Sequence, residues 1–141
     1  MGLKKKKHTL KTQVVVDKKT GKVICTNFCN GKKHDFKLFK ESKVRWVKSI
    51  KGLVDSGYTG IKKIHESTEV PKKKTKRKPL TREEKVKNRE ISSERVRNEH
   101  TIGFLKRFKI LSERYRNRRK RFGLRFNLIS GICNYELSQP A

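Results

Sequence analysis

The sequence predicts an α/β fold, and three stretches carry that prediction. Residues 10–17 and 22–29 are rich in β-branched and apolar side chains, with a short polar turn containing a glycine between them. We therefore expect an antiparallel hairpin there. The apolar stretch 44–54 leads to a further strand, which we expect to end at Asp55. Residues 83–108 are polar and high in helix propensity, so strands and helices alternate along the chain.

Two shorter helices are expected around these strands. The first covers residues 34–42, with Asp35 as its N-cap, and the second covers residues 59–66, just after the Asp55 strand. Thr81, ahead of two glutamates, marks the start of the long helix. A last helical segment, Phe122 to Leu137, is apolar on two sides, which predicts deep packing against the sheet. One side has Phe122, Phe126, Ile129 and Cys133, and the other Leu124, Leu128, Ile132 and Tyr135.

The charge balance indicates a polyanionic partner. Forty Lys and Arg against thirteen Asp and Glu give a formal net charge of +27 over 141 residues. Release of counterions from phosphates gives such a chain sequence-independent affinity for nucleic acid. A membrane is a weaker candidate, because no apolar stretch approaches a spanning length. We therefore expect a cytoplasmic protein, associated with the nucleoid, whose partner is DNA or RNA.

Two regions concentrate the positive charge. Residues 71–79 form an expected basic loop that orders on binding and resembles a nuclear-localisation run. Residues 106–137 form a basic helical C-terminal region, where arginine forks match phosphates and the ring of Tyr115 could stack on a base. The predicted DNA-binding residues are Lys72, Lys73, Lys74, Lys76, Arg77, Lys106, Arg107, Arg116, Arg118, Arg119 and Arg121.

Cysteine and histidine give no sign of a structural metal. The three cysteines form no CxxC pair, and the four histidines show no spacing that would complete a zinc site with them. We expect reduced thiols, with Cys25 and Cys133 in the core. Trp46 is likewise interpreted as a core residue, and Asp17 as a turn residue.

Two carboxylates are candidates for chemistry. Asp55 follows an apolar run and precedes a Ser-Gly turn, which places it at the carboxyl end of a strand, where ligands collect. An ordinary turn aspartate would have the same context. Glu99 shares a helical stripe with Val96 and Ile102, so it needs a partner there. That partner is either a metal ion or Arg95, one turn earlier on the same face.

Several short motifs carry a family resemblance through their order and spacing. They are Lys6–Gln13, Gly31–Asp35, Val54–Gly60, Arg95–His100, Gly103–Phe108 and Tyr115–Arg119. In this order they resemble the C-terminal part of the catalytic domain of DDE-type transposases from bacterial insertion sequences. The group is the one related to eukaryotic Harbinger elements. The resemblance covers essentially all of residues 1–141, as one partial catalytic domain.

The resemblance implies a ribonuclease H-like fold, in which a mixed five-stranded sheet has helices on both sides. It also implies that two aspartates and one glutamate hold two divalent ions, Mg²⁺ or Mn²⁺, for attack on a phosphodiester of DNA. Asp55 matches the second aspartate of the family and Glu99 its glutamate. Glu90 and Glu94 are the nearby rivals of Glu99.

One departure from the family bears on activity. The family's first aspartate lies on a first strand that precedes the segment matching this chain, and neither Asp17 nor Asp35 matches it. We therefore expect a truncated ribonuclease H-like fold with the first strand missing, inactive alone in DNA transposition. Its expected partners are transposon ends and target DNA, the N-terminal part of the transposase and, as an open alternative, a second copy.

Two other functions fit part of the sequence. A small basic RNA-binding protein of ribosomal type explains the charge and length equally well. It leaves Asp55 and Glu99 unexplained. A nuclear basic protein would rest on lysine composition alone.

Overall fold

The first two strands form the expected hairpin. In the computed structural model, which describes residues 9–140, β1 (Leu10–Val16) and β2 (Val23–Asn30) pair antiparallel. In the turn, the Asp17 carboxylate accepts the N–H of Lys19 at 2.7 Å. Gly21 has a φ of 74°, a conformation that favours glycine. Asp17 is therefore the turn residue that the sequence predicts.

The second sheet is much smaller than expected. β3 (Gly52–Leu53) pairs in parallel with β4 (Thr68–Glu69), and within residues 9–140 this pair does not join the hairpin. The strand expected just before Asp55 is therefore present but only two residues long, and the rest of the apolar stretch 44–54 lies outside it. Lys43 has a left-handed φ of 55°, which turns the chain just before this stretch. The fold of the described residues is mixed α/β with two small sheets, and no five-stranded sheet forms among them.

The two short helices depart from expectation in different ways. Helix α1 (Asp35–Ser42) lies where it was predicted, but its N-cap is His34. Asp35 is instead the first helical residue, and its carboxylate pairs with Lys11 Nζ at 3.0 Å. Over residues 59–66 only a 3₁₀ turn, η1 (Ile61–Lys63), forms. Gly60 precedes it with a φ of 96°, so a regular helix cannot begin at residue 59.

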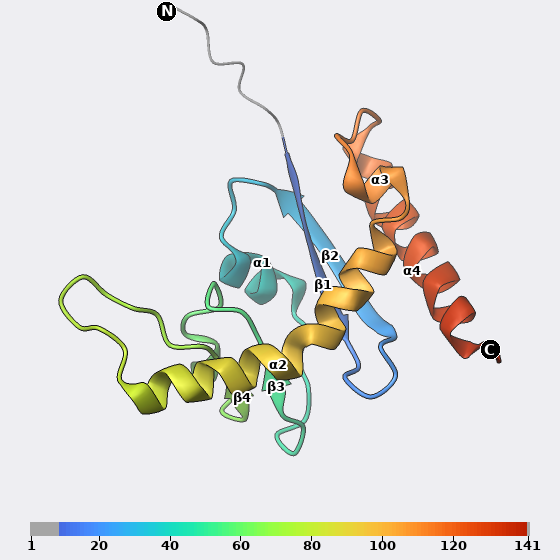
Figure 1. Ribbon diagram of the computed structural model, residues 1–141. Helices are drawn as coiled ribbons and strands as arrows, with labels where there is room; N and C mark the ends of the chain where they lie inside the picture. The colour runs from blue at the N-terminus through green and yellow to red at the C-terminus, as the bar shows by residue number, and fades with distance from the viewer. Residues whose placement is uncertain (1–8, 141) are drawn as a thin grey trace, which may run out of the picture.

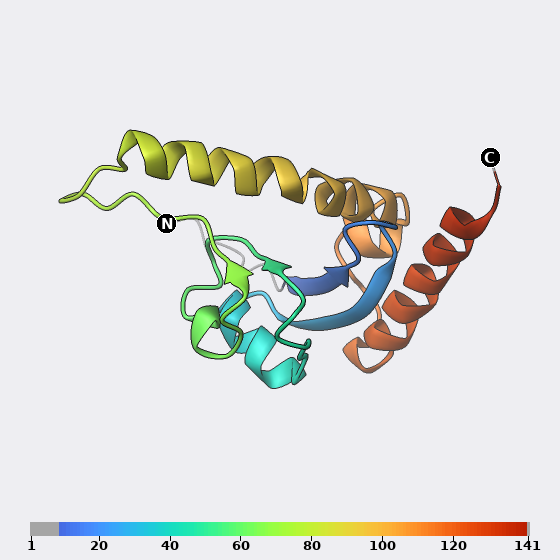
Figure 2. The ribbon, with the colours of Figure 1, turned by 90° about the horizontal axis from the view of Figure 1, so that it is seen from below.

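The long helix is confirmed. Helix α2 (Arg82–Leu105) begins at a capping box in which Thr81 and Glu84 exchange side-chain to backbone hydrogen bonds. It contacts β3 and α4 (Phe122–Ser138). Figure 1 shows it as the longest element, and Figure 2 shows it along one side of both small sheets, with α1 on the opposite side.

The main core lies between the hairpin and the C-terminal helix. After α3 (Lys109–Ser112) and η2 (Arg119–Arg121), α4 packs against β2. The Asn134 side chain both accepts the N–H and donates to the carbonyl of Val23, each at 2.8 Å. The buried core residues there are Val23, Leu105, Phe122, Phe126, Ile129 and Cys133.

The second apolar side of α4 is exposed, so the prediction of burial on both sides is wrong. The exposed fractions of Leu124, Leu128 and Tyr135 are 74%, 64% and 68%. The hairpin is only two strands wide, so it covers one face of the helix and no described element covers the other.

A smaller aromatic cluster holds the β3–β4 half together. The ring of Trp46 stacks on buried His65, with the ring centroids 4.2 Å apart, and Phe39 meets both rings edge-on. Trp46 is therefore packed in a core, as predicted. Cys133 is buried and Cys25 half-buried, where burial raises the pKa of the Cys25 thiol.

Candidate acidic centre and nucleic-acid interface

Asp55 lies just beyond the carboxyl end of β3, as predicted. Its side chain is 61% exposed, and it accepts the backbone N–H of Ser56 at 2.6 Å. Its carbonyl oxygen accepts the N–H of Tyr58 at 3.1 Å. Asp55 is thus a turn residue and a strand-end carboxylate at once, so its geometry is compatible with both interpretations.

Arg95 connects α2 to this turn. Its guanidinium Nη1 lies 3.8 Å from Asp55 Oδ1, and its side chain is only 18% exposed. The sequence offered Arg95 as a partner for Glu99, whereas the structure pairs it with Asp55. Because Glu99 follows Arg95 by four residues, the two lie on the same face of α2, one turn apart.

Glu99 lies on the solvent side of α2. Val96 on the same stripe is 41% exposed, and Gly103 has open space around it, so the stripe is not a buried one. The expectation of a carboxylate among buried apolar side chains is wrong, because α2 buries only Ile91, Thr101 and Leu105. Among residues 9–140, Glu99 makes no ion pair.

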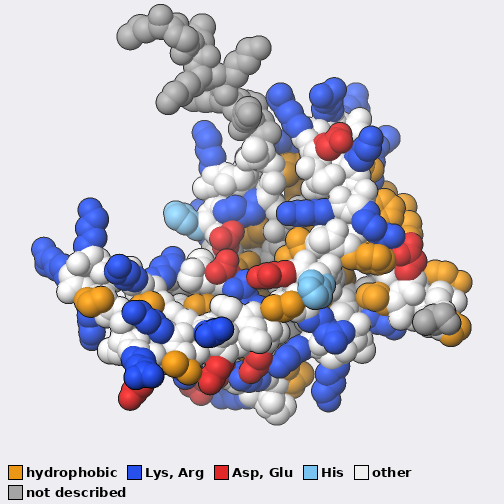
Figure 3. All heavy atoms as spheres, in the orientation of Figure 1, with side chains coloured by type: hydrophobic (Ala, Val, Ile, Leu, Met, Phe, Trp, Pro, Cys, Tyr) orange, Lys and Arg blue, Asp and Glu red, His pale blue; other side chains and the backbone are white. Residues whose placement is uncertain are grey.

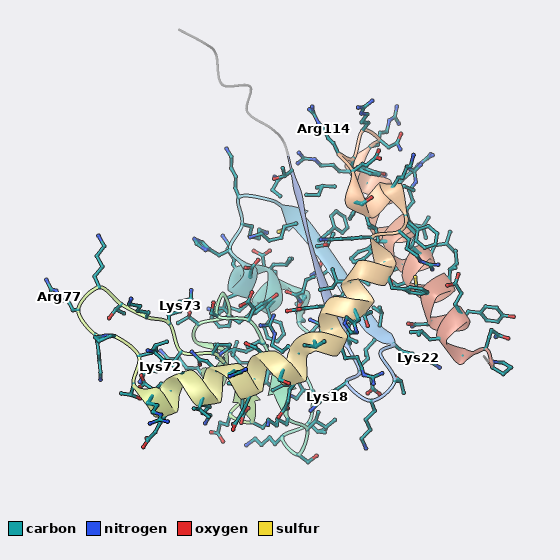
Figure 4. The ribbon with its side chains drawn as sticks, in the orientation of Figure 1. Lys18, Lys22, Lys72, Lys73, Arg77 and Arg114 are labelled. Atoms are coloured by element: carbon teal, nitrogen blue, oxygen red, sulfur yellow. The ribbon has the colours of Figure 1, made fainter. Side chains whose placement is uncertain are left out.

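The nearby rival Glu94 is engaged by lysines from other elements. Lys18 Nζ lies 2.9 Å from its carboxylate and Lys51 Nζ 3.8 Å away. The hydrogen bond from Lys18 and the charge of both lysines lower the pKa of Glu94. Lys18 projects from the turn of the hairpin (Figure 4).

Asp35 and Tyr58 lie beside Asp55 and Arg95, and we call these four residues the acidic centre. The sequence analysis predicted neither Asp35 nor Tyr58 as part of a site. Asp35 Oδ2 would lie 2.8 Å from a Cβ at Gly57, so a side chain at this position would have to push that carboxylate aside. Burial, followed by the charges of Asp35 and Asp55, raises the pKa of Tyr58 to about 12, although Arg95 acts to lower it. The glycine in the Ser-Gly turn was the available signal, since such a glycine often marks the close approach of another group.

The Tyr58 phenol gives a direct test of this geometry. Because the folded state holds its proton more tightly than the unfolded chain, this contribution to stability is present below about pH 10 and is lost as the pH rises toward 12. The difference in phenolate absorbance between wild type and Tyr58→Phe should titrate with a midpoint near 12. Asp35→Asn should lower that midpoint. A midpoint near 10 that Asp35→Asn leaves unchanged would contradict the arrangement.

The acidic centre does not amount to a full metal site. Across residues 9–140, no three His, Cys, Asp or Glu side chains lie close enough to hold one ion. Asp55 also faces a guanidinium, which a bound cation would have to displace. The predicted ligands Asp55 and Glu99 are both exposed carboxylates, and their role stays a prediction.

In the basic loop of residues 71–79, every residue from Lys72 to Lys78 is exposed to solvent. Its base is fixed to α2, because the Asn88 side chain accepts the N–H of Lys72 at 2.8 Å and donates to its carbonyl at 2.9 Å. Lys72 also pairs with Glu84. Of the predicted loop residues, Lys73, Lys74, Lys76 and Arg77 make no ion pair within the described part of the chain. Figure 4 shows Lys73 and Arg77 projecting from the loop.

The second basic region is divided between paired and free side chains. Arg107 pairs with Glu136 at 2.7 Å and lies over the Phe104 ring, 3.6 Å from its centre. Arg119 donates to Asn30. Lys106, Arg116, Arg118 and Arg121 are exposed and without an ion pair in residues 9–140. The same holds for Arg114, which lies in the predicted basic region but not among the predicted DNA-binding residues.

Tyr115 is not available for stacking on a base, so that prediction is wrong. Its ring packs edge-on against Phe122, with the centroids 4.9 Å apart. Its hydroxyl donates to the Arg118 carbonyl at 3.2 Å and accepts from Arg125 at 3.1 Å. Tyr115 therefore holds the arginine-rich segment, residues 114–121, against the core.

Comparison with known proteins shows the family of this chain. Residues 3–134 match the model of the DDE superfamily endonucleases, and the chain belongs to that family. It is 52% identical over 134 residues to the probable transposase for insertion sequence element IS702 from Microchaete diplosiphon. The match covers 95% of this chain and 49% of that protein, so the chain spans about half the length of the curated relative it matches.

The resemblance to DDE-type transposases of insertion sequences is therefore confirmed. The family implies a ribonuclease H-like fold and the use of divalent metal ions. No solved structure matches this chain significantly. Within the described residues, no helix is long and apolar enough to cross a membrane.

Proposed function

We propose that this chain forms part of the catalytic domain of an insertion-sequence transposase, a DNA endonuclease that cuts transposon ends and joins them to target DNA. The observation that carries the proposal is the Arg95–Asp55 contact. It places the strand-end carboxylate beside Arg95 on α2, one helical turn before Glu99. A strand-end aspartate and a helical glutamate are the two acidic positions that the family resemblance assigns to this chain.

Asp55 and Glu99 are our proposed ligands for Mg²⁺ or Mn²⁺. Such ions would supply electrostatic stabilisation for attack on a phosphodiester and prefer carboxylate oxygens. Glu99 is favoured over Glu94, because Glu94 is held by Lys18 and Lys51. Two carboxylates do not complete a two-metal site, so we derive no catalytic step from them. We propose that the remaining half of a longer transposase supplies the first strand and first aspartate, and that residues 1–141 alone do not transfer strands.

DNA, rather than ribosomal RNA, is the proposed partner, with the cytoplasm and nucleoid as its place of action. A ribosomal-type RNA-binding protein would have the same charge. It gives no reason for the Asp55–Arg95 contact or for an unpaired carboxylate on α2.

A chimera tests this function. In it, this chain replaces the matching half of the Microchaete diplosiphon transposase, and nicking of DNA is measured with Mg²⁺ or Mn²⁺. We expect Asp55→Ala and Glu99→Ala each to slow nicking on the order of 10³-fold, because a metal contributes several kcal/mol to the transition state.

The matched control is Glu94→Ala, a lysine-paired carboxylate on the same helix, which should leave the rate within about threefold. Residues 1–141 alone should show no nicking and only weak Mn²⁺ binding. If the chimera nicks DNA and Asp55→Ala or Glu99→Ala leaves the rate unchanged, the site assignment is wrong.

A further inference from the structure

Two dense basic segments lie on either side of a helix whose own charges are nearly balanced. We define the first basic end as residues 72–78 and the second as residues 114–121; each has six Lys or Arg and no Asp or Glu. Helix α2, which lies between them in the chain, has six basic and five acidic residues. Its net charge is therefore close to neutral, so phosphates are attracted to the ends and not to the helix between.

The two basic ends lie at opposite ends of α2. The first leads directly into the helix, and the second follows it after α3. In Figure 4, Lys72, Lys73 and Arg77 lie at one end of α2 and Arg114 lies beyond the other. Figure 3 shows Lys and Arg side chains over most of this face, both ends included, with Asp and Glu side chains scattered among them.

Both basic ends are held in place by contacts to the rest of the fold. Asn88 on α2 bonds to the N–H and carbonyl of Lys72, at the base of the first. The Tyr115 hydroxyl bonds to the Arg118 carbonyl and its ring packs on Phe122, beneath the second. Each basic end therefore has a fixed place in the fold, the first at the start of α2 and the second beyond α3.

The length of α2 matches one turn of duplex DNA. Twenty-four residues span about 36 Å at ~1.5 Å per residue. Equivalent phosphates on one side of B-DNA recur about every 34–36 Å, or about 10–10.5 base pairs. We propose that the two basic ends bind phosphates of one duplex about one helical turn apart. The acidic centre would then face the stretch of DNA between the two bound phosphates. This inference rests on the proposed function, and it adds a substrate requirement: duplex DNA of at least about one turn.

The test is the dependence of affinity on duplex length, measured by fluorescence anisotropy at fixed salt with blunt duplexes of about 7, 9, 12, 16 and 22 base pairs. We expect affinity to rise at least tenfold between about 9 and 12 base pairs, beyond the gradual increase expected from the number of binding positions. A smooth length dependence with no step would overturn the inference while leaving DNA binding intact. Failure to bind duplex at any length would overturn the proposed function itself.

Two charge-neutralised variants assign the step to the basic ends. Lys73, Lys74, Lys76 and Arg77 are changed to Gln in one, and Arg114, Arg116, Arg118 and Arg121 in the other. Each variant should bind more weakly and lose the step. A control with the same charge loss at exposed positions outside both ends, Lys19, Lys48, Lys62 and Lys63, should bind more weakly but keep it. A step that persists in either end variant would contradict the two-ended arrangement. All these residues are exposed, so each variant should fold, and circular dichroism is the check of folding.

Discussion

Replacing Phe122 with alanine is expected to lower the free energy of unfolding by about 3–5 kcal/mol, the range for removing a buried phenylalanine. Its side chain is 2% exposed. It meets Phe28 edge-on with centroids 5.0 Å apart and also contacts Tyr115 and Phe126. Phe122 therefore packs α4 against both the hairpin and the arginine-rich segment of residues 114–121. A loss of this size is a large part of the stability of a typical domain.

Leu124 is the matched control for Phe122. It lies two residues later on the same helix but is 74% exposed, so Leu124→Ala should change the free energy of unfolding by no more than about 0.5 kcal/mol. Urea denaturation followed by circular dichroism measures both variants. If the two substitutions cost the same, α4 does not pack on the hairpin through the face that contains Phe122.

Local signals in the sequence were sufficient for some elements. The hairpin follows from two β-branched runs around a polar turn, and α2 begins at the Thr81 capping box, as the sequence predicts. The prediction failed where long-range packing decides. Local sequence did not show that the strand before Asp55 would be only two residues long: Val47 and Ile50 ahead of it are 62% and 54% exposed, while Trp46 stacks on His65.

The acidic centre shows the same limit. The position of Asp55 at the end of β3 follows from local sequence. Its pairing with Arg95, forty residues later, does not, because neither residue carries a sign of its partner. Lys18 and Glu94 are further apart still in the chain. Glu99 was predicted from an apolar stripe, but the structure shows that this face of α2 is exposed. The role of Glu99 therefore stays a prediction.

The largest expected effect on binding comes from the basic loop. Neutralising Lys73, Lys74, Lys76 and Arg77 together should reduce the slope of log K against log salt by about 3–4, because each phosphate contact contributes about 0.9. The loss in DNA affinity at low salt should be roughly 10²-fold. These side chains are exposed and make no ion pair within residues 9–140, so their full charge is available to phosphates.

Lys72 and Lys73 give the sharpest comparison inside that loop. They are adjacent, but Lys72 is paired with Glu84 and its backbone is held by Asn88, whereas Lys73 is free among the described residues. Lys73→Gln should therefore reduce the salt slope by close to 0.9, and Lys72→Gln by clearly less, since phosphate must first displace a carboxylate. Glu84→Gln alone should raise DNA affinity. In the Glu84→Gln background, Lys72→Gln should reduce the salt slope by as much as Lys73→Gln does. Equal slopes for the two single variants would show that the Lys72–Glu84 pair does not persist in solution, and that the loop binds phosphate by charge density alone.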